Sequence, residues 1–204
     1  MSTLWTVLGI IAGIVVLLVV FWASVYNRLV RLRNWSEESF SQVDVQLQRR
    51  NDLIPNLVET VKGYSKHESE TLDAVVKARQ QIVNLPMDAT PEQKNELSNQ
   101  LTGALSRLLA VAEAYPELKA NQNYLDLQRS LEETEDLIAK ARQIYNSSIG
   151  QYNTGIQTFP NSLVAGLSGF APKAYLQAPA EAKEAPKRSE ENTSELQSLV
   201  IISY

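Results

Sequence analysis

The first pattern in the chain is a long apolar run without charge. No side chain in residues 1–27 is charged, and residues 4–25, "LWTVLGIIAGIVVLLVVFWASV", are almost wholly apolar. As a helix, such a run is roughly 33 Å long, enough to cross a hydrocarbon core of ~30 Å. Trp5, Trp22 and Tyr26 lie near its ends, where amphipathic aromatic side chains favour the membrane interface. A cleaved signal peptide fits less well, because the run is too long and lacks a basic leader and an A-x-A site. The pattern predicts a retained transmembrane anchor over residues 1–27.

Behind the anchor, apolar residues recur at steps of three and four, which is typical of a helix with one buried stripe. Arg50 occupies the one missing place in this series, and the polar run after Gly63 predicts a turn near residues 63–67. This helix can continue directly from the membrane span. The apolar positions are Phe40, Val43, Leu47, Ile54, Leu57, Val61 and Tyr64.

Two further helices have clear boundaries. A helix around residues 72–83 must stop at or before Leu85, because Pro86 disfavours helical geometry in the residue before it. The segment "TPEQ" at 90–93 supplies an N-cap threonine, a proline at the first helical position and a glutamine that completes a capping box. The helix that starts there is expected to end at Pro116.

A last long helix runs from about Tyr124 to Tyr152 and closes at Phe159-Pro160. No stretch alternates with period two, so no sheet is expected. We therefore predict an all-α fold: an N-terminal transmembrane helix followed by an antiparallel four-helix bundle of long helices.

The domain organisation follows from composition. The anchor covers residues 1–27 and the bundle residues 28–171, in which residues 161–171 form a short amphipathic piece against the bundle. The tail, residues 172–204, is rich in Ala, Pro and Glu and is expected to be disordered. Its "RSEENTSELQS" resembles the translation of a sequencing-library adapter, so an artefactual end over residues 188–204 stays open.

Composition removes several kinds of chemistry. Acidic residues outnumber basic ones, 23 to 19, so there is no sign of a nucleic-acid interface. The chain has no cysteine and one histidine, His67, which we interpret as an exposed turn residue because a metal site needs further ligands. No cofactor, metal or nucleic-acid partner is expected. Arg28, Arg31 and Arg33 follow the span, and this one-sided bias places the N-terminus outside and the bundle in the cytoplasm.

Arg49 and Arg50 are the first candidate site. Guanidinium groups match carboxylates and phosphates, so the pair could receive an acidic ligand or partner. The favoured alternative is structural, because a seam arginine is costly unless a carboxylate pairs with it. The candidate partners are Asp52, Glu113, Glu132 and Glu135.

Pro55 lies one turn further along the same helix. A proline there removes a hydrogen bond and clashes with the carbonyl of Asn51, so we predict a bent joint. Asn51, Asp52 and Asn56 could hydrogen-bond to backbone groups around the bend. A binding notch at this joint stays open as the alternative.

Two Tyr-Asn pairs, Tyr145-Asn146 and Tyr152-Asn153, recur seven residues apart and so repeat on the same helix faces. Tyrosines packed in the core are the default interpretation, and a polar ladder that recognises a partner is the alternative. The acidic residues at 132–136 are interpreted as a solvated helix face.

Several segments together resemble the LemA family, over roughly residues 4–170. The most specific is "RRNDLIPNLVETVKGYSKHE" at 49–68, supported by "YNRLV" at 26–30, "LLAVAEAYPELKAN" at 108–121 and "YNSSIGQYNTGIQTFP" at 145–160. The resemblance implies a bacterial protein with one transmembrane helix and a cytoplasmic helical bundle. No enzymatic activity is established for this family, so the resemblance implies none here. It also implies an association with membrane proteases, as for some members of the family.

The sequence thus favours a non-enzymatic, membrane-anchored bundle that acts as a scaffold or regulatory adaptor in the inner membrane. Expected partners are the lipid bilayer and a membrane protease or other membrane protein, and homo-oligomerisation stays open. The alternative is an envelope signalling or stress-response component that transmits a state through its span, with Pro55 as the bistable element. An enzyme using carboxylates or Arg50 is the third hypothesis.

Overall fold

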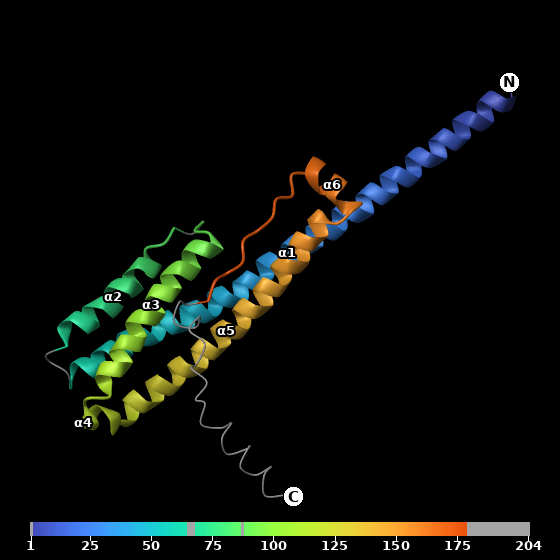
Figure 1. Cartoon of the computed structure of the whole chain (residues 1–204). Coiled ribbons are helices and arrows are strands. Elements are labelled where there is room, and N and C mark those ends of the chain that lie inside the picture. Colours follow the sequence, from blue (N-terminus) through green and yellow to red (C-terminus); the bar gives the residue numbers. More distant parts are fainter. Residues whose placement is uncertain (1, 65–67, 87, 179–204) are drawn as a thin grey trace, which may run out of the picture.

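The computed structural model describes residues 2–64, 68–86 and 88–178, and within them the regular structure is entirely helical (Figure 1). The predicted all-α fold is confirmed. His67, which was interpreted as a turn residue, and the tail from residue 179 lie outside the described residues. The helices are α1 (Ser2–Lys62), α2 (Ser69–Val83), α3 (Pro91–Ala112), α4 (Pro116–Lys119), α5 (Gln122–Gln157) and α6 (Asn161–Leu167).

Helix α1 joins the apolar run of residues 4–25, called the apolar arm below, to the bundle without a break. It has 61 residues and is therefore about 90 Å long. Its N-terminal arm has no neighbours, and an apolar window in it is wholly exposed, as expected for a segment that meets lipid. The prediction that the span continues directly into the first bundle helix is confirmed.

Helices α1 and α5 form a long antiparallel pair, and the α2–α3 hairpin covers only its far half (Figure 1). The core is accordingly divided along the long axis into three clusters. The far cluster is a four-helix core that includes Ile54, Val75 and Leu101. The middle cluster lies around Tyr145, and the cluster nearest the apolar arm packs α6 against α1.

Local stereochemistry sets the start of α3 as the sequence predicts. Thr90 accepts a hydrogen bond from the Gln93 backbone at 3.3 Å, and the Gln93 side chain accepts one from the Thr90 backbone at 3.0 Å. This completes the capping box of α3. Helix α3 ends at Ala112, slightly before Pro116, and this proline instead takes the first position of α4.

The short amphipathic piece expected over residues 161–171 is present as α6. The expectation of disorder from residue 172 onward is wrong for residues 172–178, which run extended along the bundle (Figure 1). Leu176 is only 5% exposed and belongs to the middle core cluster. The composition misled because side chains of α5, rather than the segment itself, provide its hydrogen-bond partners.

Candidate functional site

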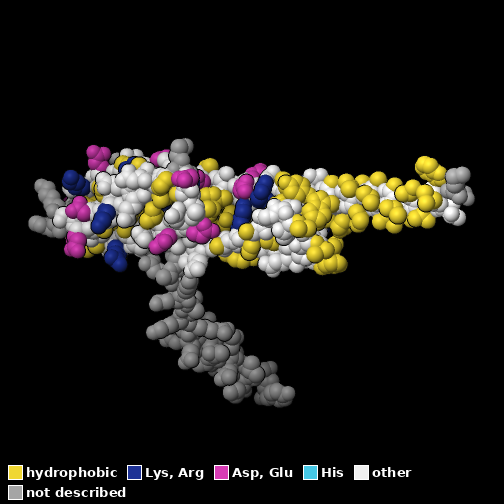
Figure 2. All heavy atoms as spheres, turned by 90° about the horizontal axis from the view of Figure 1, so that it is seen from above, with side chains coloured by type: hydrophobic (Ala, Val, Ile, Leu, Met, Phe, Trp, Pro, Cys, Tyr) yellow, Lys and Arg dark blue, Asp and Glu magenta, His cyan; other side chains and the backbone are white. Residues whose placement is uncertain are grey.

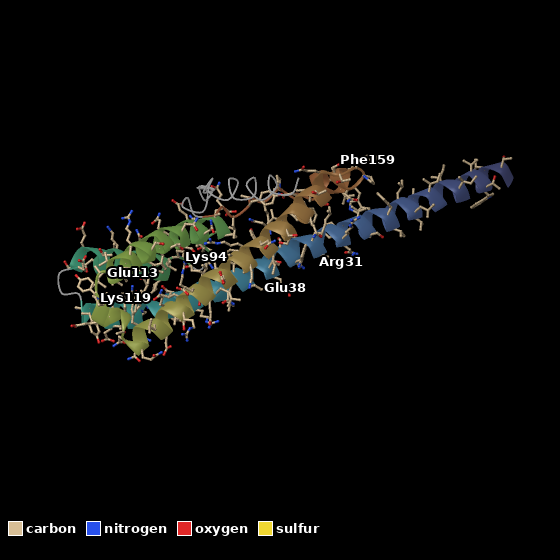
Figure 3. All side chains as sticks on the ribbon, turned by 60° about the horizontal axis from the view of Figure 1, so that its bottom comes forward. Arg31, Glu38, Lys94, Glu113, Lys119 and Phe159 are labelled. Carbon is tan, nitrogen blue, oxygen red and sulfur yellow. The ribbon has the colours of Figure 1, made fainter. Side chains whose placement is uncertain are left out.

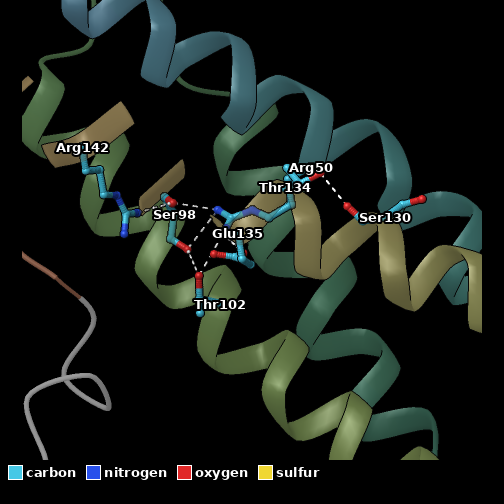
Figure 4. Close-up of polar contacts among 7 residues, drawn as sticks. All are labelled: Arg50, Ser98, Thr102, Ser130, Thr134, Glu135 and Arg142. Atoms are coloured by element: carbon cyan, nitrogen blue, oxygen red, sulfur yellow. Dashed lines mark hydrogen bonds and ion pairs between the residues drawn. The ribbon is translucent and has the colours of Figure 1, made fainter. Parts of the chain in front are cut away.

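Arg50 lies at the centre of the bundle and is completely buried, with 0% exposure (Figure 4). Its Nη1 donates to Thr102 Oγ1 at 2.9 Å and pairs with Glu135 Oε1 at 2.5 Å. Its Nη2 donates to the hydroxyl of Ser98 at 2.7 Å and to the Ser98 carbonyl at 3.2 Å. One side chain of α1 therefore ties α3 and α5 together.

A second arginine shares this network. Arg142 of α5, also buried, donates from Nη2 to the Ser98 hydroxyl at 2.9 Å, so Ser98 accepts from both guanidinium groups. Burial lowers the pKa of Arg142 and the nearby charge of Arg50 lowers it further, while Glu135 acts in the opposite direction. Sequence reasoning missed Ser98 and Arg142, because neither interrupts an apolar series in a conspicuous way.

The geometry favours the structural role for Arg50. Of the four candidate carboxylates, Glu135 is the partner that the structure places beside it. Glu113 instead pairs with Lys119 (Figure 3), and Asp52 accepts from Gln48 at 2.8 Å. Because Arg50 has no exposed surface, its guanidinium cannot receive a ligand from solvent in this structure.

Arg49 is adjacent to Arg50 in the sequence but differs from it in burial. It is exposed, whereas Arg50 is enclosed. A helix turns 100° per residue, so adjacent side chains face different surroundings. Of the two predicted arginines, only Arg50 belongs to the central network.

Pro55 lies inside α1, which remains helical on both sides of it. Since proline has no N–H, the carbonyl of Asn51 lacks its usual intrahelical donor. Arg79 of α2 supplies a replacement, with Nε donating to the Asn51 carbonyl at 3.2 Å. The sequence had offered Asn51, Asp52 and Asn56 for this purpose, and Arg79 was not foreseen.

The two asparagines of the ladder bind the backbone of the C-terminal segment. Asn146 donates from Nδ2 to the Leu176 carbonyl at 2.9 Å, and its Oδ1 accepts the Leu176 N–H at 2.9 Å. Asn153 does the same with Lys173, at 2.9 and 3.0 Å. Both amide side chains are therefore bidentate. In the described structure they hold a segment of their own chain.

The spacing of the ladder matches the segment that it holds. Seven residues of helix rise about 10.5 Å, and three residues of extended chain span about 10 Å. The pairs Asn153–Lys173 and Asn146–Leu176 run in opposite directions, so the segment returns antiparallel to α5. Lys173 also donates to Ser36 at 3.0 Å and pairs with Glu37 at 3.2 Å.

The ladder tyrosines are core residues. Tyr152 donates to the Ala171 carbonyl at 2.9 Å. Tyr145 stacks edge-on against Phe40 with ring centroids 5.5 Å apart. Burial, and secondarily the charge of Glu92, raise the pKa of Tyr145 to about 12, so its hydroxyl stays protonated near neutral pH.

An open groove of about 580 Å³ lies between α1 and α5, with Asn56 and Asn123 on its walls. Asn56 is exposed there and available for contact. Within the described ranges, no three His, Asp or Glu side chains gather into a group that could hold a metal ion.

The apolar arm and the bundle that continues from it define a helical protein, with one candidate membrane span among the residues that the structure describes. The chain belongs to the LemA family, whose sequence model matches residues 39–189. This match extends beyond residue 170 and so includes the segment that the asparagines hold.

Named relatives agree with this assignment. Protein LemA of Metamycoplasma hominis is 29% identical over 139 residues, which cover 68% of this chain and 63% of that protein. Magnetosome protein MamQ 2 of Paramagnetospirillum magneticum is 29% identical over 195 residues, covering 84% of this chain and 70% of its own length. Magnetosome protein MamQ of Magnetospirillum gryphiswaldense is 28% identical over 168 residues, covering 71% and 62%. The chain thus spans about 63% of the LemA relative's length.

Proposed function

We propose that this chain is a non-enzymatic, membrane-anchored helical bundle that acts as a scaffold or regulatory adaptor for other membrane proteins. The observation that carries the proposal is α1, in which one uninterrupted helix is both the apolar arm and a central helix of the bundle. A bundle held in this way stays close to membrane partners, and this raises its effective concentration there. The engagement of Arg50 with internal partners supports a structural use of the central charges.

In this proposal the protein lies in the inner membrane, with the N-terminus outside and the bundle in the cytoplasm. Arg28, Arg31 and Arg33 follow the apolar run, and basic residues favour the cytoplasmic side. The proposed partners are the lipid bilayer and a membrane protease or other membrane protein. Self-association of the bundle is a further possibility that the same experiment addresses.

Photo-crosslinking in intact membranes tests the adaptor role. We would place a probe at Asn56 and, in a second variant, at Asn123, because both residues line the exposed α1–α5 groove. A matched probe at Arg107, an exposed residue of α3, controls for random collisions. A specific protein partner captured from the groove positions and not from Arg107 would support the adaptor. Self-crosslinks alone would favour a homo-oligomeric scaffold, and no crosslink would favour the signalling alternative.

That alternative, an envelope signalling or stress-response component, rests on the joint at Pro55. There Arg79 of α2 replaces the missing backbone donor of α1. A movement of α1 would therefore be transmitted to α2 through this hydrogen bond. Pro55→Ala separates the two proposals. A scaffold should bind its partners as before apart from a change in stability, whereas a signalling component should lose its response to the external state.

A further inference from the structure

The part of the bundle nearest the apolar arm carries no charge on two of its three helices. From Gln143 to Pro172 there is no Asp, Glu, Lys or Arg, although the preceding half of α5 is rich in them. This uncharged stretch includes the last 15 residues of α5, from Gln143 to Gln157, and all of α6. Figure 2 shows the same division, with charged side chains over the far part of the molecule and apolar ones toward the arm.

Helix α6 lies at the level where the membrane span ends. Its Val164 and Ala165 are buried in one cluster with Val25 and Leu29 of α1. Val25 is the last residue of the apolar run, so α6 is placed beside the boundary of the hydrocarbon core. Tyr26, next along α1, packs edge-on against Phe170 at 5.7 Å between ring centroids.

The outer surface of α6 is apolar and uncovered. Leu163 and Leu167 are 59% and 77% exposed, and they lie one helical turn apart on the same face. Phe159, just before α6, is 77% exposed and projects from the same end of the bundle as Arg31 (Figure 3). Exposed apolar side chains that gather beside a candidate membrane span are suited to contact with lipid.

We propose that α6 is a second membrane contact, with Phe159, Leu163 and Leu167 inserted at the boundary between lipid headgroups and acyl chains. The partner is a bilayer that contains anionic phospholipid. Arg28 and Arg31 are exposed just after the end of the span, at the level of α6, where they can contact negatively charged headgroups. Continuity with the span and the absence of charge favour lipid over a protein partner. This inference deepens the proposed function and rests on its membrane anchoring.

A second contact would fix the orientation of the bundle. A single helix can rotate about its own axis and tilt in the bilayer, and interfacial anchors limit both motions. Because α6 packs on one side of the α1–α5 pair, it would hold that side toward the membrane. The α2–α3 hairpin covers the other end of the pair and therefore lies far from the α6 contact (Figure 1).

The absence of native cysteine makes a site-specific test direct. Full-length single-cysteine variants are spin-labelled and reconstituted in vesicles of phosphatidylcholine and phosphatidylglycerol. Collision rates with oxygen, which concentrates in lipid, and with a water-soluble nickel chelate are then measured. The labelled positions are Leu18 in the span, Leu163 and Leu167 on α6, and Asn123 at the far end of α5 as the aqueous control.

The expected result is an oxygen-to-nickel ratio at Leu163 and Leu167 that lies between the ratios at Leu18 and Asn123 and is several-fold above that at Asn123. A ratio equal to that of Asn123, while Leu18 remains in lipid, would overturn the α6 contact and leave the anchoring intact. If Leu18 itself met the nickel chelate, the membrane anchoring in the proposed function would fall, and the α6 contact with it.

A second set of variants guards against an effect of the label. With the label at Phe159→Cys, the double change Leu163→Glu and Leu167→Glu should move the label from oxygen toward nickel access. The control is Leu125→Glu, at an exposed leucine near the far end of α5, which should leave the label unchanged. Unchanged access at residue 159 in the double variant would contradict the proposal.

Discussion

Arg50 shows how a charged residue is accommodated on the apolar seam of a helix. Its two terminal nitrogens have partners from α3 and α5, and the carboxylate of Glu135 offsets its charge. A buried charge of this kind costs most when a partner is lost, because the remaining group is left desolvated and unpaired. We therefore expect the network to specify the register among the three helices more than to add net stability.

We expect Arg50→Ala to lower the free energy of unfolding by about 3–5 kcal/mol, because it opens a cavity and removes the guanidinium that donates to Thr102 and Glu135. Partial exposure of Glu135 places the value toward the lower end. Arg49→Ala, at the exposed neighbour, should stay within about 0.5 kcal/mol of wild type. Denaturant unfolding of the two full-length variants measures the difference, and equal losses would contradict the buried network.

Tyr145 gives the protein a predicted sensitivity to alkali. Its pKa is about 12 in the folded state, above the ordinary value of ~10, so the folded protein retains a proton that the unfolded chain releases. The associated stabilisation is complete below pH ~10 and is lost as the pH rises toward about 12. Tyr145→Phe should show a smaller fall of unfolding free energy over this interval. Tyr175→Phe, at an exposed tyrosine, is the control and should follow wild type.

At the scale of the elements, backbone groups that lack a local hydrogen-bond partner are paired with side chains from another element. The carbonyl left free by Pro55 is satisfied from α2, and the backbone of the extended segment is satisfied from α5. Both arrangements obey the general requirement that buried backbone groups be paired. Each one also joins residues that lie 20 to 30 positions apart in the sequence.

A double-mutant cycle tests the repair at Pro55. Arg79→Ala should cost about 1–3 kcal/mol of unfolding free energy, since it leaves the Asn51 carbonyl without a donor. Pro55→Ala restores the backbone N–H and should stabilise α1 by up to ~3 kcal/mol. In the Pro55→Ala background Arg79→Ala should cost less, and strictly additive effects would show that Arg79 is not the replacement donor.

The asparagine ladder is tested by hydrogen exchange. In the double variant Asn146→Ala and Asn153→Ala, the backbone amides of Lys173 and Leu176 should exchange much faster, because each amide donates to one of these side chains. Asn123→Ala, at an exposed asparagine of the same helix, is the matched control. Unchanged protection at both amides would mean that packing of Leu176 alone holds the segment.

At the scale of the whole molecule, α1 provides both the proposed membrane anchor and part of the bundle. Its apolar arm addresses the bilayer, and its C-terminal part forms a wall of the four-helix core. The α1–α5 pair leads away from the proposed membrane surface, so the exposed groove beside Asn56 lies far from the span (Figure 1). Such a shape suits a bundle that meets partners at a distance from the bilayer.

Cysteine labelling in intact cells tests the proposed topology. A single cysteine at Ser2 should react with an impermeant maleimide from outside. One at Asn123 should react only after the inner membrane is permeabilised. The reverse pattern would contradict the orientation derived from Arg28, Arg31 and Arg33, while still agreeing with a membrane span.

The sequence alone determined the apolar arm, the end of α2, the start of α3 and the all-α class. These features depend on neighbours in the chain: an apolar run of membrane length, steps of three and four, a capping box at Thr90 and a proline after Leu85. It also restricted the partner of Arg50 to four carboxylates. Local stereochemistry and periodicity carry this information without knowledge of the packing.

Only the tertiary structure decided which distant groups meet. Glu135 pairs with Arg50 across 85 residues of sequence, Arg142 shares Ser98, and Arg79 completes the helix at Pro55. It also showed that Asn146 and Asn153 hydrogen-bond to the backbone of residues 172–178, a stretch whose composition predicted disorder. Such contacts depend on the relative rotation and register of helices, which arise from packing the whole core rather than from any local pattern.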